Sequence, residues 1–186
     1  MTAGTGGDLA VFHFSGHGAL LGPEGKEQYY LLPHEVDART KQQIRNTAIA
    51  IGELRGRLEE LGRHGRVLAL LDACHSGAAT LADGAVAVDG GALRSALAGL
   101  PNVTVLTSSS SVAPSIERDD WQNGAFTEVL LRALGKDADA DQNGLISMTE
   151  LTGFLSEQLP RLTAGGEAQQ PGMEVRFQSE VFVSDL

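Results

Sequence analysis

The chain has 186 residues, of which 42% are hydrophobic and 20% are charged, and these values are typical of one globular domain with a sizeable core. A net charge of −10 argues against binding of nucleic acids or anionic membranes, and it favours cationic partners. The single cysteine excludes an internal disulfide, and the first residues lack the pattern of a signal peptide. No stretch approaches the roughly 18 apolar residues that span a bilayer, so we expect a cytoplasmic protein.

Short apolar runs rich in β-branched and aromatic residues predict the strands. In chain order they are Leu9–Ser15, Tyr29–Leu32, Arg66–Asp72, Val103–Ser108, and a terminal strand or hairpin within Val175–Phe177 and Val181–Val183. Hydrophobic residues at helical spacing predict helices over Glu53–Gly62, Leu93–Leu100, Phe126–Leu134 and Met148–Leu159. The Ala- and Gly-rich stretch Gly77–Gly91 predicts a mobile loop. Strands that alternate with helices predict an α/β fold with a mostly parallel central sheet.

Two segments with nucleophilic and basic side chains follow predicted strands. Gly16–Gly18 follows Leu9–Ser15 and is expected to form a tight loop that carries His17, whereas Cys74 follows Arg66–Asp72. In parallel sheets, sites gather at the carboxyl ends of strands. A thiol becomes a good nucleophile when a base from another loop favours the thiolate, and His17 meets this condition. The backbone N–H groups of Gly18 and Cys74 are candidates for an oxyanion hole.

Structural explanations exist for each of these residues on its own. A lone buried cysteine is usually inert, and a histidine between glycines is often a turn residue. The other histidines are better explained as structural, either because they lie within a strand, next to the thiol or in polar connections: His13, His75, His34 and His64. Ser76 lacks the surrounding G-x-S-x-G elbow of a serine nucleophile.

The motifs "FHFSGHG" and "LLDACHSG", together with Pro114–Leu134, resemble the caspase-like cysteine peptidases of clan CD (peptidase C14), specifically the metacaspase and bacterial orthocaspase branch. The resemblance implies a caspase–haemoglobinase three-layer sandwich, formed as one domain by residues 1–186. Within it, 1–80 would match the large subunit, 81–100 a mobile linker region and 101–186 the small subunit.

The resemblance also implies the site and its substrate. Cysteine endopeptidases of this branch use a His–Cys dyad, here His17 and Cys74, with the amides of Gly18 and Cys74 as the oxyanion hole. Their substrate pocket is acidic and selects Arg or Lys at P1, and the matching positions here are Ser15 and Asp72. A partly buried carboxylate pairs with a guanidinium and repels an acidic side chain. The alternative for Asp72 is a carboxylate that merely caps a loop.

The chain departs from the family at its beginning. The family has a strand, a helix and a second strand before the "SGHG" strand, whereas only about eight residues precede it here. We therefore expect an N-terminally shortened sheet whose apolar edge at Leu9–Ser15 is open to self-association or to a partner chain. A fragment, a sheet completed by another polypeptide, or a protein without activity would each account for the departure.

Residues 139–150, "DADQNGLISMTE", match the twelve-residue EF-hand pattern D-x-[DN]-x-[DN]-G-x₅-E. The pattern predicts a Ca²⁺ site, and it places oxygen ligands on Asp139, Asp141, Asn143, Leu145, Ser147 and Glu150. Gly144 would permit the sharp turn. The alternative is a polar connection whose acidic side chains cap the following helix.

Two functions of different class remain open on the sequence. The first is an active cysteine endopeptidase that cuts after basic residues, with calcium bound at the acidic loop. The second is a catalytically inactive caspase-like module that binds calcium or a partner chain. A calmodulin-type sensor explains only one loop and leaves most of the chain without a role.

Overall fold

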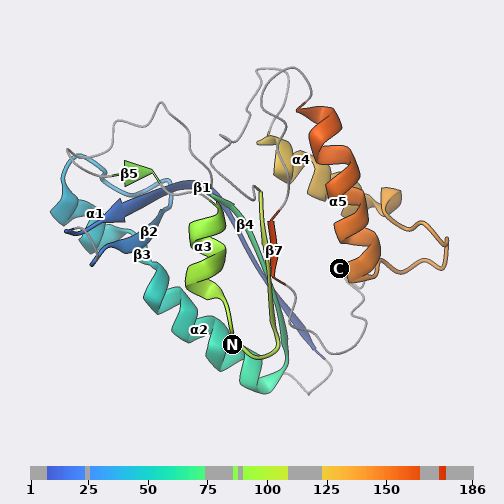
Figure 1. The fold of residues 1–186 in the computed structure, drawn as a ribbon, viewed down its shortest axis with the longest axis horizontal. Coiled ribbons are helices and arrows are strands. Elements are labelled where there is room, and N and C mark those ends of the chain that lie inside the picture. The colour runs from blue at the N-terminus through green and yellow to red at the C-terminus, as the bar shows by residue number, and fades with distance from the viewer. Residues whose placement is uncertain are drawn as a thin grey trace.

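The computed structural model describes residues 8–23, 26–73, 86–87, 90–108, 123–163 and 172–174. The strands are β1 Leu9–Leu21, β2 Gln28–Leu32, β3 Ile49–Ala50, β4 Arg66–Ala73, β5 Val86–Ala87, β6 Val103–Thr107 and β7 Gly172–Glu174. The helices are α1 Lys41–Thr47, α2 Ile51–His64, α3 Gly90–Leu97, α4 Ala125–Arg132 and α5 Met148–Leu162, with a short π-helix η1 over Ala133–Asp137. Figure 1 shows the described elements as one sheet with helices on both of its faces.

The centre of the sheet is parallel and its edges are antiparallel. The strand order is β3-β2-β1-β4-β6-β7, and β5 pairs with β1 outside this order. β1 runs parallel to β4, and β4 runs parallel to β6, as expected for strands linked through helices. β2, β3, β5 and β7 add antiparallel pairs, so the sheet as a whole is mixed. The predicted α/β class and parallel core are confirmed.

Side-chain alternation along β4 produces the two faces of the core. Leu68 and Leu70 pack with α4 and α5 on one face, whereas Val67, Ala69 and Leu71 pack with α2 and α3 on the other. Every residue of β4 after Arg66 is buried, which explains its continuous apolar run. The expected three-layer sandwich is therefore present, with α2 and α3 across the sheet from α4 and α5 (Figure 1).

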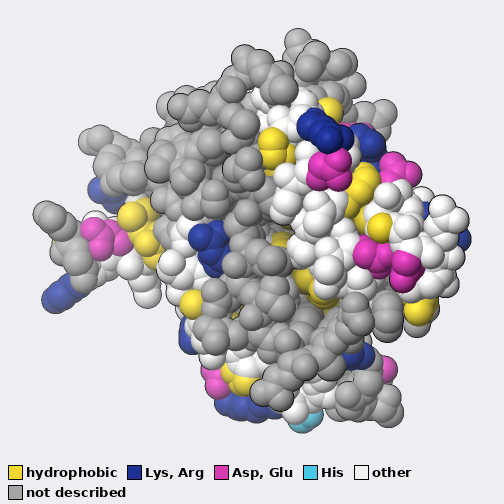
Figure 2. All heavy atoms as spheres, turned by 45° about the vertical axis from the view of Figure 1, so that its right-hand side comes forward, with side chains coloured by type: hydrophobic (Ala, Val, Ile, Leu, Met, Phe, Trp, Pro, Cys, Tyr) yellow, Lys and Arg dark blue, Asp and Glu magenta, His cyan; other side chains and the backbone are white. Residues whose placement is uncertain are grey.

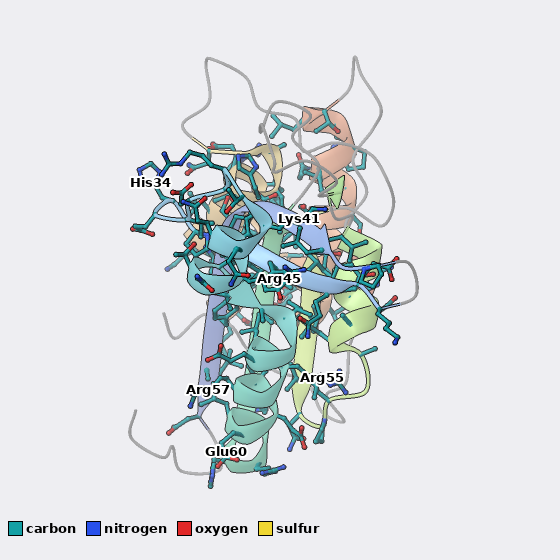
Figure 3. All side chains as sticks on the ribbon, turned by 90° about the vertical axis from the view of Figure 1, so that its left-hand side faces the viewer. His34, Lys41, Arg45, Arg55, Arg57 and Glu60 are labelled. Atoms are coloured by element: carbon teal, nitrogen blue, oxygen red, sulfur yellow. The ribbon has the colours of Figure 1, made fainter. Side chains whose placement is uncertain are left out.

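A hydrogen-bonded contact ties α2 to α3 on their shared face. Arg55 of α2 reaches toward α3, and its guanidinium donates to the carbonyls of Ala96 and Ala98, both at 2.9 Å (Figure 3). The last carbonyls of a helix lack partners within the helix, and a cationic donor also complements the negative end of the helix dipole. Arg55 therefore caps the end of α3 that lies just before β6.

β1 is longer than the sequence predicts. It continues through Gly16–Gly18 to Leu21, so these glycines lie in a strand and the expected tight loop is wrong. The strand changes partner along its length: Leu9–Gly16 pairs with β4, and His17–Leu21 pairs with β2. Gly16 stands at this change, where an added Cβ would lie 3.0 Å from the Phe14 ring and 3.4 Å from the Leu32 carbonyl oxygen.

Within the described residues, the first part of β1 pairs along one edge only, and one of its faces is exposed. Among the described residues, Leu9–Gly16 has a strand partner only in β4. The face that β1 shares with α4 and α5 is exposed at Val11, His13, Ser15 and His17, and Val11 is 38% exposed. The described part of the chain thus contains no strand on this edge, and the partner expected there stays a prediction.

Other elements differ from the predictions in extent. α1 and β3 were not predicted, and β5 lies inside the stretch that was expected to be a mobile loop. Helix α3 begins at Gly90, three residues before the start predicted for it, and lies within the stretch assigned to a linker region. The terminal strand predicted within 175–183 falls outside the described residues. The short strand β7 immediately precedes that segment in the chain and pairs with β6.

Gly62 and Gly56 offer a matched test of the packing of α2. A Cβ on Gly62 would lie 2.5 Å from the Pro101 carbonyl oxygen, whereas a Cβ on Gly56 would meet nothing within 4 Å. We expect Gly62→Ala to lower the free energy of unfolding by about 1–3 kcal/mol, because the backbone of α2 or of Pro101 must move to make room for the added Cβ. Gly56→Ala should raise it by about 0.5–1 kcal/mol because alanine favours the helix. Urea unfolding measures both, and equal effects would contradict the close approach of α2 to Pro101.

Candidate active site

Three of the predicted site residues lie on one face where the parallel pairing of β1 with β4 ends, in the middle of β1 and at the carboxyl end of β4. Ser15 is paired with Asp72 across the two strands, and Gly16 is paired with Ala73. Because side chains alternate along a strand, His17 projects from the same face as Ser15. Parallel pairing puts Asp72 on that face as well. The predicted neighbourhood of the His17 strand and the strand leading to Cys74 is therefore correct.

The remaining predicted residues are described only in part. Gly18 is buried and pairs with Leu31 of β2. Cys74 follows directly after the last residue of β4 and lies outside the described residues, as do His75 and Ser76. The dyad and the oxyanion hole therefore stay predictions, with the histidine side positioned by β1.

Asp72 is the buried carboxylate of the site, with 4% of its surface exposed. Its Oδ2 accepts a hydrogen bond of 2.8 Å from the hydroxyl of Thr127, which lies on α4 and is also buried. A Cβ on Gly124 would lie 3.1 Å from the same oxygen. Buried carboxylates need hydrogen-bond donors or cations around them, and α4 supplies one such donor.

Of the other described histidines, His13 and His34 lie where the sequence predicts, whereas His64 belongs to a helix and not to a polar connection. His13 lies on β1, four residues before His17, with its side chain exposed on the same face. His34 is exposed in the turn that follows β2. His64 ends α2, and its Nε2 lies 3.3 Å from a carboxylate oxygen of Glu60.

The comparisons with known proteins now decide the family. The model of the caspase domain family matches residues 2–182, nearly the whole chain.

The chain belongs to the caspase domain family.

No curated protein matches this caspase-domain chain. Among solved structures, it is similar to protein GSU0716 from Geobacter sulfurreducens, with 18% identity and a TM-score of 0.56. That match covers 92% of this chain and 67% of the other, and at this identity it supports the fold. Within the described residues, no helix is both long enough and apolar enough to cross a membrane.

The caspase-domain chain also carries an acidic loop between η1 and α5. Ligand oxygens of Asp139, Asp141 and Glu150 all lie within 4.8 Å of one another. Oxygens bound to one Ca²⁺ at 2.3–2.6 Å can be separated by at most about 5 Å, so the three groups fit around such an ion. Figure 2, which turns the α4 and α5 side forward, shows acidic side chains in small groups on this surface.

Backbone donors shape the acidic loop. Asp139 accepts from the amides of Asn143 and Gly144, at 3.1 and 2.9 Å. Gly144 has a φ of +85°, as the sharp turn requires. Ile146 is buried in the core shared by α4 and α5, which fixes the loop to the domain.

Glu150 also caps α5, so the helix-capping alternative holds for this residue. It forms a capping box with Ser147, whose hydroxyl accepts from the Glu150 amide. The Ser147 amide and hydroxyl both donate to the carboxylate at 2.9 Å, and the Asp141 and Ala140 amides donate to its other oxygen. These donors hold the pKa of the Glu150 carboxyl below its ordinary value. Capping and metal binding use the same carboxylate and do not exclude one another.

Sequence reasoning missed Thr127 and Gly124. Thr127 contacts Asp72 across 55 positions of the chain, and no local pattern signals such a contact. The prediction of a helix over Phe126–Leu134 identifies the element but not the residue on it that faces the site.

Proposed function

We propose that the chain is a cysteine endopeptidase that cleaves after Arg or Lys through a His17–Cys74 dyad. The observation that supports this proposal is that Ser15, His17 and Asp72 share one face near the point where the parallel pairing of β1 with β4 ends. Cys74 is the next residue after β4, and it is the only cysteine of the chain. Membership in the caspase domain family supports the reaction class.

The proposed reaction proceeds in two steps. His17 accepts the thiol proton of Cys74, and the thiolate attacks the scissile carbonyl carbon to form a C–S bond and an oxyanion. The amides of Gly18 and Cys74 would stabilise that oxyanion. Collapse breaks the C–N bond, and the imidazolium of His17 returns the proton to the departing amine. Water, activated by His17, then hydrolyses the thioester and regenerates the thiol.

Asp72 would supply the substrate preference. It is a buried carboxylate on the same face as His17, and Ser15 is its partner across the strands. An ion pair with a guanidinium or ammonium group is stronger when solvent is excluded, and an acidic P1 side chain would be repelled. The P1 preference for Arg and Lys follows from this charge.

Fluorogenic peptides that differ only in the P1 residue test the function. Peptides with Arg, Lys or Asp at P1 are incubated with the purified chain, in calcium or in a chelator, beside Cys74→Ala as the control for contaminating peptidases. Turnover of Arg and Lys peptides that is lost in Cys74→Ala is the expected result. A folded chain that cleaves none of them would favour a non-catalytic interaction module, and cleavage of Asp peptides alone would remove the role of Asp72.

Calcium binding at residues 139–150 is a second proposed property. It rests on the convergence of Asp139, Asp141 and Glu150, with Asn143, the Leu145 carbonyl and Ser147 as the remaining ligands of the sequence pattern. Calcium would join the end of η1 to the start of α5 and thereby stabilise this side of the domain.

Glu150→Gln separates metal binding from helix capping. Glutamine can also occupy the third position of a capping box, but it loses the bidentate carboxylate. Calcium at a hundredfold excess over Kd should stabilise the wild type by about 2.7 kcal/mol, seen as a higher Tm, and this gain should disappear in Glu150→Gln. Glu157→Gln, which removes an exposed ion pair with Arg161 on the same helix, is the control. A wild-type Tm that calcium does not change would leave Glu150 as a helix cap only.

A further inference from the structure

The beginning of α4 is packed against the carboxylate that would recognise the substrate. Thr127 donates to Oδ2 of Asp72 at 2.8 Å. Thr127 and Asp72 are 7% and 4% exposed, so little water competes for this hydrogen bond. A hydroxyl that donates to a carboxylate in a dry environment makes a short, strong hydrogen bond.

Both ends of this hydrogen bond belong to elements that are fixed by packing. Asp72 lies on β4, which is buried along nearly its whole length. On α4, Phe126, Val129 and Leu130 are buried in the core that also contains Leu68 and Leu70 of β4. Because neither backbone can shift, the hydrogen bond forms only when the Asp72 side chain adopts one rotamer. The hydrogen bond therefore restricts the carboxylate to that rotamer.

Gly124 provides the room that this arrangement needs. Its φ and ψ of −62° and 156° are open to any residue, so its backbone conformation does not require glycine. A Cβ at this position would, however, lie 3.1 Å from Oδ2 of Asp72. The absence of a side chain is thus explained by the close approach of the carboxylate.

We propose that Thr127, with Gly124 beside it, is a positioning residue that orients the Asp72 carboxylate toward the basic P1 side chain of the substrate. This inference rests on the proposed function, and it assigns substrate preference to a contact between β4 and α4. The hydroxyl holds Oδ2, and the fixed rotamer sets the direction in which the carboxylate presents its charge. Thr127 does not touch the substrate.

The ratio of kcat/KM for a Lys peptide to that for its norleucine counterpart measures the role of the carboxylate, since norleucine lacks the ammonium group. Thr127→Val should lower this ratio about tenfold, mainly through KM for the Lys peptide, because the carboxylate loses its orientation. Thr127→Ser keeps the hydroxyl and should restore the ratio. Gly124→Ala should lower it as well, because the added Cβ displaces Oδ2.

Thr104→Val is the matched control. Thr104 is a buried threonine of β6 whose hydroxyl has no hydrogen-bond partner among the described residues. It pairs with Leu68 of β4, four residues before Asp72. The same substitution there should leave the ratio unchanged. If Thr127→Val alters both peptides equally, or the ratio stays at its wild-type value, the inference is overturned while the peptidase proposal stands.

Peptide binding distinguishes failure of the inference from failure of the proposed function. Calorimetry of the Lys peptide with Cys74→Ala and with Cys74→Ala/Thr127→Val requires no turnover. Binding that weakens about tenfold with the second substitution supports the positioning role, even if the wild type is inactive. Equal affinities, or no binding by either protein, overturn it.

Discussion

Replacing His17 with alanine is expected to lower kcat/KM for Arg and Lys peptides by about 10²–10⁴-fold, because the thiol loses the base that accepts its proton. The Tm should change little, since the side chain is exposed on the open face of β1. The expected loss lies in kcat, because His17 acts in the chemical step and not in binding the P1 side chain. Initial rates over a range of substrate concentrations measure both constants.

His13→Ala is the control for this prediction. His13 lies on the same strand and the same exposed face, four residues before His17. Its replacement should leave both constants nearly unchanged, because four residues of extended strand separate it from His17 by about 13 Å. If the two substitutions had equal effects, a general disturbance of β1 would explain them and the dyad would not.

Asp72→Asn should produce the second large effect. Asparagine has the same shape and can still accept from the Thr127 hydroxyl, so the fold should tolerate it. The charge is lost, and removal of one partner of a buried charge pair costs about 2–5 kcal/mol, which corresponds to a fall of about 30- to 5000-fold in kcat/KM for Arg and Lys peptides. Norleucine peptides should be affected far less.

One result would contradict a role of Asp72 in substrate preference. A fall of equal size for Lys and norleucine peptides would indicate that the carboxylate only holds the end of β4, as the loop-capping explanation states. Asp37→Asn serves as the control: this carboxylate pairs with Arg39, which holds its pKa at about 2, and it belongs to the segment before α1. Its replacement should leave the peptide preference unchanged.

The core of the fold could be predicted from the sequence because local patterns determine it. The continuous apolar run of β4 requires burial on both faces, and the spacing of Leu54 and Leu58 requires a helix with one buried side. Adjacent parallel strands then bring the residues after them to one edge of the sheet. This argument correctly predicts that the strand bearing His17 lies beside β4, the strand that precedes Cys74.

The parts that could not be predicted depend on contacts between distant residues. Glycines usually indicate a turn, but Gly16 and Gly18 lie within β1 because β2 pairs with its second half. α1 contains a single buried residue, Ile44, and so has little periodic pattern. The hydrogen bond from Thr127 to Asp72 joins two elements 55 residues apart, which no short motif can specify.

The way in which β1 is paired within the described part of the chain has a physical consequence for the proposed site. His17 is held by β2 on one side, whereas the preceding Leu9–Gly16 is held by β4 alone among the described residues. A strand that is paired on one edge only has unpaired backbone N–H and C=O groups on the other edge, and it is held less firmly than a strand paired on both edges. The orientation of His17 therefore depends on β2 and on the packing of Phe14 into the core with α2.

The most direct measurement of the central claim is covalent trapping of Cys74 by a peptidyl electrophile. A thiol-selective peptidyl acyloxymethyl ketone with Arg at P1 is incubated with the chain, and the adduct is located by peptide mapping with mass spectrometry. Because Cys74 is the only cysteine, one adduct is possible on a thiol. We predict that the reagent with Arg at P1 forms an adduct on Cys74 much faster than the same reagent with Asp at P1. We also predict that His17→Ala slows formation of this adduct. Absence of an adduct, or equal rates for the Arg and Asp reagents, would contradict the assignment of a basic-specific cysteine peptidase.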